Sequence, residues 1–175
     1  MERHTKFDPG QERNHFNAIS VNYEKVMKTV GYPDPELIAS CAKKIADEKK
    51  IHRSEALVAD FGCGTGMVGE ALDHHGFTKV YGIDCSEGML QLAEEKKVYV
   101  SLTQHQLGGQ DFLETFPSHL KNKFDFVTAG GLIEALNYDD KIFQQMLFSL
   151  KNGGYLIISL QYSYIGNFEY HETLD

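Results

Sequence analysis

Residues 58–72 constrain the fold of this chain more than any other segment. An apolar run leads to Asp60, glycines follow at positions 62, 64 and 66, and an apolar pattern of helical spacing then begins. Glycines at alternate positions allow a tight turn with positive φ and let a ligand approach the backbone closely. The segment therefore predicts a strand, a ligand-binding turn and a helix, in that order.

Apolar segments of strand type and helix type alternate along the rest of the chain. Strands are predicted near 56–61, 79–84, within 99–107, at 124–129 and at 155–160, and helices near 16–30, from 34, after Gly66, after Ser86 and at about 140–150. Such alternation requires crossover connections and a parallel sheet that is covered on both faces. We expect an α/β fold of the Rossmann-like, doubly wound type, with a mostly parallel sheet of about five strands and additional N-terminal helices.

Length and charge limit the organisation of the chain and its partners. The 175 residues fit one domain, and the polar residues 1–13, with Pro9-Gly10, are expected to be a flexible lead to a single domain over 14–175. The chain has 17 basic and 25 acidic residues, which gives a net charge of -8. Nucleic acids and anionic membranes attract basic surfaces, so we expect neither as a partner.

Compartment and metal content follow from what the sequence lacks. No apolar run approaches the roughly 20 residues of a membrane-spanning helix, and the N-terminal residues contain no apolar signal region. The three cysteines lie 22 residues apart, which fits neither a zinc site nor a disulfide framework. His74, His75 and His105 have no metal-ligand spacing with carboxylates. We expect reduced thiols, no bound metal and a cytoplasmic location.

Several polar or glycine-rich segments are predicted at one edge of the sheet. Ligands of open parallel sheets bind outside the carboxyl ends of the strands, where the glycine turn, Asp84, Asp111 and Gly130 are all expected. Asp84 can accept hydrogen bonds from both hydroxyls of a ribose. Asp111 can accept one from an exocyclic amine such as that of adenine, with Phe112 or Met89 against the ring. Alternatively, Asp111 is an ordinary loop acid, because loops favour aspartate.

The glycines permit a second interpretation. Residues 64–69 also match G-x-G-x-x-G, the dinucleotide pattern. In dinucleotide-binding folds the first glycine follows the strand directly, whereas here Asp60 would stand near a doubly charged pyrophosphate. The sulfonium and ammonium groups of S-adenosylmethionine suit that carboxylate, and a pyrophosphate does not. An NAD-binding protein is therefore the minor alternative.

These segments together resemble the class I S-adenosylmethionine-dependent methyltransferases. The resemblance covers roughly residues 14–162. It rests on five features: an acid with G-x-G-x-G at 60–66, the ribose acid Asp84, the adenine-side acid Asp111, the fourth-strand segment 124–136 and the Leu-Lys-x-Gly-Gly turn at 150–154. The N-terminal helices are similar to those of small-molecule methyltransferases, in particular the methyltransferase-like proteins of the Williams–Beuren region.

The resemblance implies S-adenosylmethionine as cofactor and S-adenosylhomocysteine as product. The cofactor-binding residues that it implies are Tyr23, Asp60, Gly62, Cys63, Gly64, Thr65, Gly66, Asp84, Cys85, Met89, Asp111, Phe112, Ala129 and Gly130. Tyr23 would lie near the methionine end of the cofactor, or alternatively would be a core tyrosine on a helix stripe.

The chain departs from the family pattern at two points. Because 15 residues follow Leu160, the usual sixth and seventh strands are expected to be missing and the domain to be C-terminally truncated. The sequence also has neither the Asn-Pro-Pro-Tyr type of motif nor a Pro-Cys nucleophile. Glu134, just past the fourth strand, is the one candidate for a catalytic group, and it fits a helix surface equally well.

The absence of a recognisable base is compatible with methyl transfer. Displacement at a sulfonium has a good leaving group, and holding donor and acceptor in line contributes about 7–11 kcal/mol in favourable cases. A base is needed only where the acceptor must lose a proton. We expect a methyltransferase that acts on a small molecule, with a protein acceptor as an alternative. The second hypothesis is a domain that binds the cofactor or its product without catalysis, or serves as an interaction module.

Overall fold

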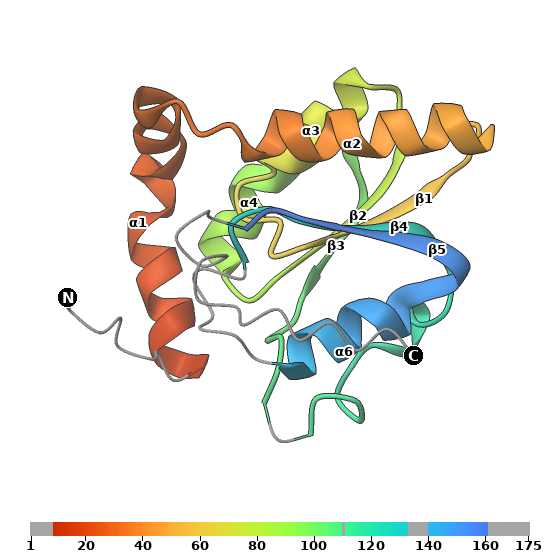
Figure 1. Ribbon diagram of the computed structural model, residues 1–175. Coiled ribbons are helices and arrows are strands. Elements are labelled where there is room, and N and C mark those ends of the chain that lie inside the picture. Colours follow the sequence, from red (N-terminus) through yellow and green to blue (C-terminus); the bar gives the residue numbers. More distant parts are fainter. Residues whose placement is uncertain (1–8, 110, 133–139, 161–175) are drawn as a thin grey trace, which may run out of the picture.

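A single parallel sheet forms the centre of the protein (Figure 1). The computed structural model describes residues 9–109, 111–132 and 140–160. Its five strands are arranged in the order β3-β2-β1-β4-β5, and every pairing is parallel. Their bounds are β1 Leu57–Phe61, β2 Lys79–Asp84, β3 Tyr99–Gln104, β4 Phe124–Ala129 and β5 Leu150–Ile158. The predicted α/β fold with about five parallel strands is confirmed.

Helices cover both faces of this sheet. They are α1 Pro9–Val30, α2 Asp34–Lys49, α3 Met67–His74, α4 Glu87–Glu95, the short 3-10 helix η1 Ser118–Leu120 and α6 Asp140–Ser149. Apolar residues of α2 and α3 pack with Val58, Val80 and Phe126 on one face. Ile142 and Met146 of α6 pack on the other face. Figure 1 shows α2 and α3 above the sheet, α6 below it, and α1 standing at one side.

The order of the strands defines where a ligand can bind. The chain runs from β1 outward to β2 and β3, and then returns to place β4 on the other side of β1. The connections on the two sides of this switch diverge, so a crevice opens at the carboxyl ends of β1 and β4. The glycine turn follows β1 directly, and Gly130 follows β4.

Two of the element boundaries at the ends of the domain differ from the prediction. Helix α1 begins at Pro9, inside the expected lead 1–13, since proline's fixed φ suits a first helical turn. Helix α2 begins at Asp34, as predicted, and its N-cap is Pro33 without a side-chain hydrogen bond. Strand β5 begins at Leu150, and the expected turn lies inside it as a shift of register beside Gly153, whose φ is +79°.

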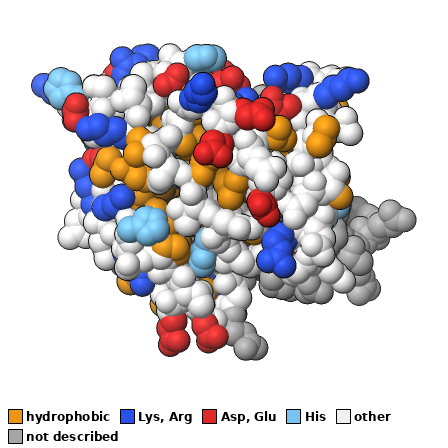
Figure 2. All heavy atoms as spheres, turned by 180° about the vertical axis from the view of Figure 1, so that it is seen from behind, with side chains coloured by type: hydrophobic (Ala, Val, Ile, Leu, Met, Phe, Trp, Pro, Cys, Tyr) orange, Lys and Arg blue, Asp and Glu red, His pale blue; other side chains and the backbone are white. Residues whose placement is uncertain are grey.

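The surface carries charges of both signs. On the face in Figure 2, basic and acidic side chains are interspersed rather than gathered into one basic area. Within the described ranges, no helix combines the length and the apolar character that crossing a membrane requires. Those residues also contain no group of three or more histidine, cysteine or acidic side chains placed to hold a metal ion.

Candidate functional site

The glycine turn has the backbone geometry that its sequence predicts. Gly62, Gly64 and Gly66 have φ values of +64°, +53° and +88°, a region that side chains disfavour and glycine adopts freely. A Cβ on Gly62 would also lie 2.6 Å from Cδ1 of Leu132, three residues after the end of β4. The turn therefore brings bare backbone to the crevice and leads into α3.

Two further glycines make room for one partly buried tyrosine, Tyr99. A Cβ on Gly69 of α3 would lie 2.3 Å from both Cζ and Oη of Tyr99, and one on Gly82 of β2 would lie 3.0 Å from its Cε1. A Cβ on Gly66 would lie 3.0 Å from Cε2 of the same ring. The last glycine of the G-x-G-x-x-G pattern thus accommodates a side chain of the protein itself. We call this space the Tyr99 slot, formed by Gly66, Gly69 and Gly82.

Asp60 lies beneath the glycine turn rather than in the crevice. It is fully buried, Tyr99 Oη donates a hydrogen bond to its Oδ2 at 2.8 Å, and Thr128 Oγ1 donates one to its Oδ1 at 2.9 Å. Burial raises the pKa of Asp60 to about 7, against the lowering effect of these two bonds, and nearby Asp84 raises it further. The predicted direct contact of Asp60 with a cationic ligand is therefore not what the geometry offers, because both carboxylate oxygens already have partners.

Asp84 connects the end of β2 to the glycine turn. Its Oδ2 accepts a hydrogen bond from Gly64 N, and its Oδ1 accepts one from Ser86 N, both at 2.8 Å. Burial raises the pKa of this carboxyl group, while the N–H donors of Ser86 and Gly64 act in the opposite direction. The Ser86 hydroxyl in turn caps α4 by accepting from Met89 N. One carboxylate thus fixes the turn and also borders the crevice.

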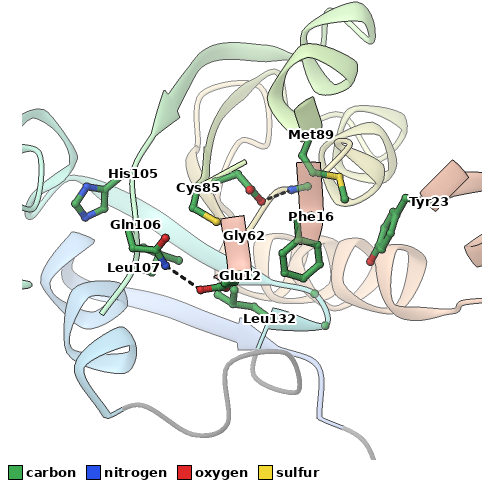
Figure 3. Close-up of a pocket in the computed structure, with 14 residues that line it drawn as sticks. Glu12, Phe16, Tyr23, Gly62, Cys85, Met89, His105, Gln106, Leu107 and Leu132 are labelled. Atoms are coloured by element: carbon green, nitrogen blue, oxygen red, sulfur yellow. Dashed lines mark hydrogen bonds between the residues drawn. The ribbon is translucent and has the colours of Figure 1, made fainter. Parts of the chain in front are cut away.

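A cavity lies between these strand ends and α1 (Figure 3). Its lining combines α1, the glycine turn and the segments that follow β2, β3 and β4: Glu12, Phe16, Tyr23, Gly62, Gly64, Asp84, Cys85, Met89, His105, Gln106, Leu107, Gly130, Gly131 and Leu132. Two of these described residues are acids, and none is lysine or arginine. Burial lowers the pKa of His105 and raises that of the Cys85 thiol to about 12, so both are neutral near pH 7. The ionisable groups of the cavity are therefore neutral or negative.

Specific side-chain contacts hold α1 over the cavity. Asn17 Oδ1 accepts hydrogen bonds from Ser86 Oγ at 2.7 Å and from Gly88 N at 3.0 Å. A Cβ on Gly88 would lie 3.0 Å from Ser20 Oγ, so glycine permits this close approach. Farther along the helix, Lys96 Nζ bridges Glu24 of α1 and Glu70 of α3, at 3.0 and 2.8 Å. Helix α1 is thus joined to α3 and α4, and Figure 3 shows its Phe16 and Tyr23 beside the cavity.

The residues expected from the sequence divide into two groups. Those that line the cavity are Tyr23, Gly62, Gly64, Asp84, Cys85, Met89 and Gly130. The others lie behind or away from it: Asp60, Cys63, Thr65 and Ala129 are buried, Gly66 borders the Tyr99 slot, and Asp111 and Phe112 are outside the lining. Glu134 lies outside the described residues.

Asp111 is the clearest difference from the sequence-based site. Strand β3 ends at Gln104, and His105, Gln106 and Leu107 immediately beyond it supply the cavity lining. Asp111 is exposed and begins a turn, in which its carbonyl accepts from the N–H groups of Glu114 and Thr115. Glu12 and Gln106 line the cavity at this end of the sheet, and neither was predicted from the sequence. Glu12 lies in the polar first turn of α1, and nothing in the local sequence there indicates a position beside the end of β3.

The titration of Asp60 leads to a test by pH. An unfolded aspartate titrates near 3.8 and folded Asp60 near 7, so the folded protein holds more protons between these values and its stability falls as the pH rises through them. We expect Asp60→Asn to remove this slope and to exceed wild type in unfolding free energy by about 1–2 kcal/mol above pH 7. The amide of the substituted side chain can still pair with both hydroxyls. Urea unfolding at pH 5 and pH 8 measures this, and equal pH slopes in the two proteins would contradict it.

Comparison with known proteins agrees with this architecture. Residues 59–158, more than half of the chain, match the family described as methyltransferase domain. Human methyltransferase-like protein 27 is 30% identical over 101 residues, which are 58% of this chain and 40% of that protein. A mitochondrial ubiquinone biosynthesis O-methyltransferase of Candida albicans is 29% identical over 124 residues, 66% of this chain and 37% of that protein. The chain thus matches less than half the length of either relative.

A solved structure shares the fold. Magnesium protoporphyrin IX methyltransferase of Synechocystis PCC 6803, crystallised with S-adenosylhomocysteine, superposes with a TM-score of 0.53 at 20% identity, over 83% of this chain and 69% of that one. At this identity the likeness concerns the fold alone. The family match over residues 59–158 is what establishes that the chain belongs to the class I S-adenosylmethionine-dependent methyltransferases.

Proposed function

We propose that this protein binds S-adenosylmethionine in the cavity under α1 and transfers its methyl group to a small molecule. The observation that carries the proposal is the charge of the lining, which has Glu12 and Asp84 and neither lysine nor arginine among its described residues. A sulfonium with an ammonium group is attracted by such a site, whereas a pyrophosphate is repelled.

Each part of the lining has a role in this proposal. Asp84 would accept hydrogen bonds from the ribose hydroxyls, and the bare backbone of the glycine turn would accommodate the methionine part. Phe16, Met89 and Leu107 offer apolar surface to the base. The bound cofactor supplies an electrophilic methyl group. The protein's own contribution is to orient the reactants and exclude water under α1, which is worth about 7–11 kcal/mol when alignment is good.

A small-molecule acceptor is supported by the names of two similar proteins and by the charge of the chain. The Candida relative is named for ubiquinone biosynthesis, and the Synechocystis structure is of an enzyme of magnesium protoporphyrin IX. Both names refer to small molecules. A net charge of -8 and the mixed charges in Figure 2 disfavour a nucleic-acid acceptor.

Two measurements test this function in sequence. Titration calorimetry of the full chain with S-adenosylmethionine, S-adenosylhomocysteine and NAD+ should give binding of the first two and none of the third. Incubation with methyl-labelled cofactor and a metabolite extract should then place label in a small molecule. Binding without transfer to metabolites or proteins would favour the non-catalytic cofactor-binding module. Failure to bind either form of the cofactor would refute the proposal.

A further inference from the structure

Glu12 is a buried acid that the sequence-based site did not contain. It lies in the first turn of α1 and is 7% exposed. Its Oε2 accepts a hydrogen bond from Gln106 Nε2 at 2.9 Å, although the two residues are 94 positions apart. Both side chains line the cavity, and Figure 3 shows this bond crossing one side of it. Because burying a carboxylate costs free energy unless it is paired, the position of Glu12 suggests that it binds a ligand.

The sheet fixes which part of a nucleoside would meet Glu12. The glycine turn follows β1, Asp84 ends β2, and Gln106 lies beyond the end of β3, so these three groups succeed one another along the sheet edge. Asp84 pairs with Gln104 in register, and His105 N donates to the carbonyl of Asp84 at 2.9 Å. A ligand with its tail at the glycine turn and its ribose at Asp84 therefore points its base toward Gln106 and Glu12.

We propose that Glu12, positioned by Gln106, recognises the exocyclic amine of the adenine base. This inference rests on the function proposed above and replaces Asp111 as the adenine-side acid. A carboxylate offers acceptors only, so it pairs with a 6-amino group and gains no such bond from a base that lacks this amine. The chain's own alternative, Asp111, is exposed and outside the cavity lining. The groups facing Glu12 are Gln106, Asp84 and Cys85, with Arg13 also near Cys85.

The burial and the hydrogen bonding of the Glu12 carboxylate support this role. Its pKa is raised, mainly by burial and also by the Asp84 charge, while the bond from Gln106 acts in the opposite direction. Burial thus disfavours the ionised form of Glu12, and a further hydrogen-bond donor would stabilise it. An amine N–H would satisfy a remaining acceptor position on Glu12 without displacing Gln106, because each carboxylate oxygen accepts more than one hydrogen bond.

Discrimination between two bases tests the inference. The probes are S-adenosylhomocysteine and its 6-deamino purine analogue, which carries a hydrogen in place of the amine and keeps the N1 acceptor, titrated into wild type, Glu12→Gln and Asp111→Asn. Wild type should prefer the adenine form by about 10- to 100-fold, the effect of a hydrogen bond to a charged group. Glu12→Gln should reduce this preference to about threefold or less, because its neutral amide bonds the amine more weakly and its NH2 can donate to N1 of either base. Asp111→Asn, the matched neutralisation, should retain the wild-type preference.

The outcomes separate this inference from the proposed function. If wild type binds neither probe, the proposed function fails and Glu12 has nothing to recognise. If wild type binds both and Glu12→Gln keeps the preference, the inference is wrong. It is equally wrong if Glu12→Gln weakens both probes by the same factor, which would mark a structural role, or if Asp111→Asn abolishes the preference. Thermal unfolding of each variant verifies that the chain remains folded.

Discussion

Gly69→Ala is expected to lower the free energy of unfolding by about 1–2 kcal/mol. The new Cβ would lie 2.3 Å from two atoms of the Tyr99 ring, and overpacking of this kind costs about 1–3 kcal/mol, with so close a contact at the upper end. Alanine also favours the helix over glycine by about 1 kcal/mol, which offsets part of the loss. Because Tyr99 bears on Gly66 as well, the displaced ring should also weaken cofactor binding.

The sign of this effect should reverse when the slot is emptied. In a Tyr99→Leu background the ring end is gone, so Gly69→Ala should stabilise by up to about 1 kcal/mol through helix propensity alone. The coupling between the two sites is then about 2–3 kcal/mol, within the range for residues in contact. Urea unfolding of the four proteins in this cycle measures it. A destabilisation by Gly69→Ala that is the same in both backgrounds would show that Tyr99 is not what the glycine accommodates.

Asp84→Ala should weaken the binding of S-adenosylhomocysteine by roughly 10- to 150-fold, corresponding to about 1.5–3 kcal/mol. The substitution removes the acceptor proposed for the ribose hydroxyls. It also releases Gly64 N and Ser86 N, which both donate to this carboxylate at 2.8 Å. The turn and the cap of α4 therefore lose their common anchor, and part of the loss in affinity will come from that disorder.

The matched control for Asp84 is Asp73→Ala. Asp73 is an exposed acid on α3, so its removal changes net charge equally without touching the cavity. The affinity of the Asp73→Ala protein for S-adenosylhomocysteine should stay within about twofold of wild type, as is usual for surface substitutions. Titration calorimetry of wild type, Asp84→Ala and Asp73→Ala measures the three affinities. An unchanged affinity in Asp84→Ala would show that the ribose hydroxyls do not bind to this carboxylate.

The sheet could be predicted because its signals are local. Strands β2 and β4 have the predicted bounds 79–84 and 124–129, since each is an apolar run closed by glycine or polar residues. Ser86 caps α4 as its position before an amphipathic run suggests. The three positive φ values of the glycine turn likewise follow from alternate glycines.

The site was predicted less completely because part of it is tertiary. Strand β3 lies at the edge of the sheet and is only partly buried, so its pattern does not mark where it ends, and the adenine-side acid was placed at Asp111. Glu12 belongs to a stretch whose polar composition suggests a flexible lead, yet α1 buries it against Gln106. Gly69 and Tyr99 are 30 residues apart, and the sequence around each gives no indication that Gly69 provides space for the Tyr99 side chain.

The raised pKa values of Glu12, Asp60 and Asp84 have a consequence for the heat of ligand binding. With a pKa of about 7, Asp60 retains a proton in roughly half of the molecules at neutral pH. A cation entering nearby favours the ionised acids, so protons are released to the solvent as it binds. The observed enthalpy then varies with the ionisation enthalpy of the buffer that receives them. A thioether product, which lacks the sulfonium charge, should displace fewer protons than the methyl donor does.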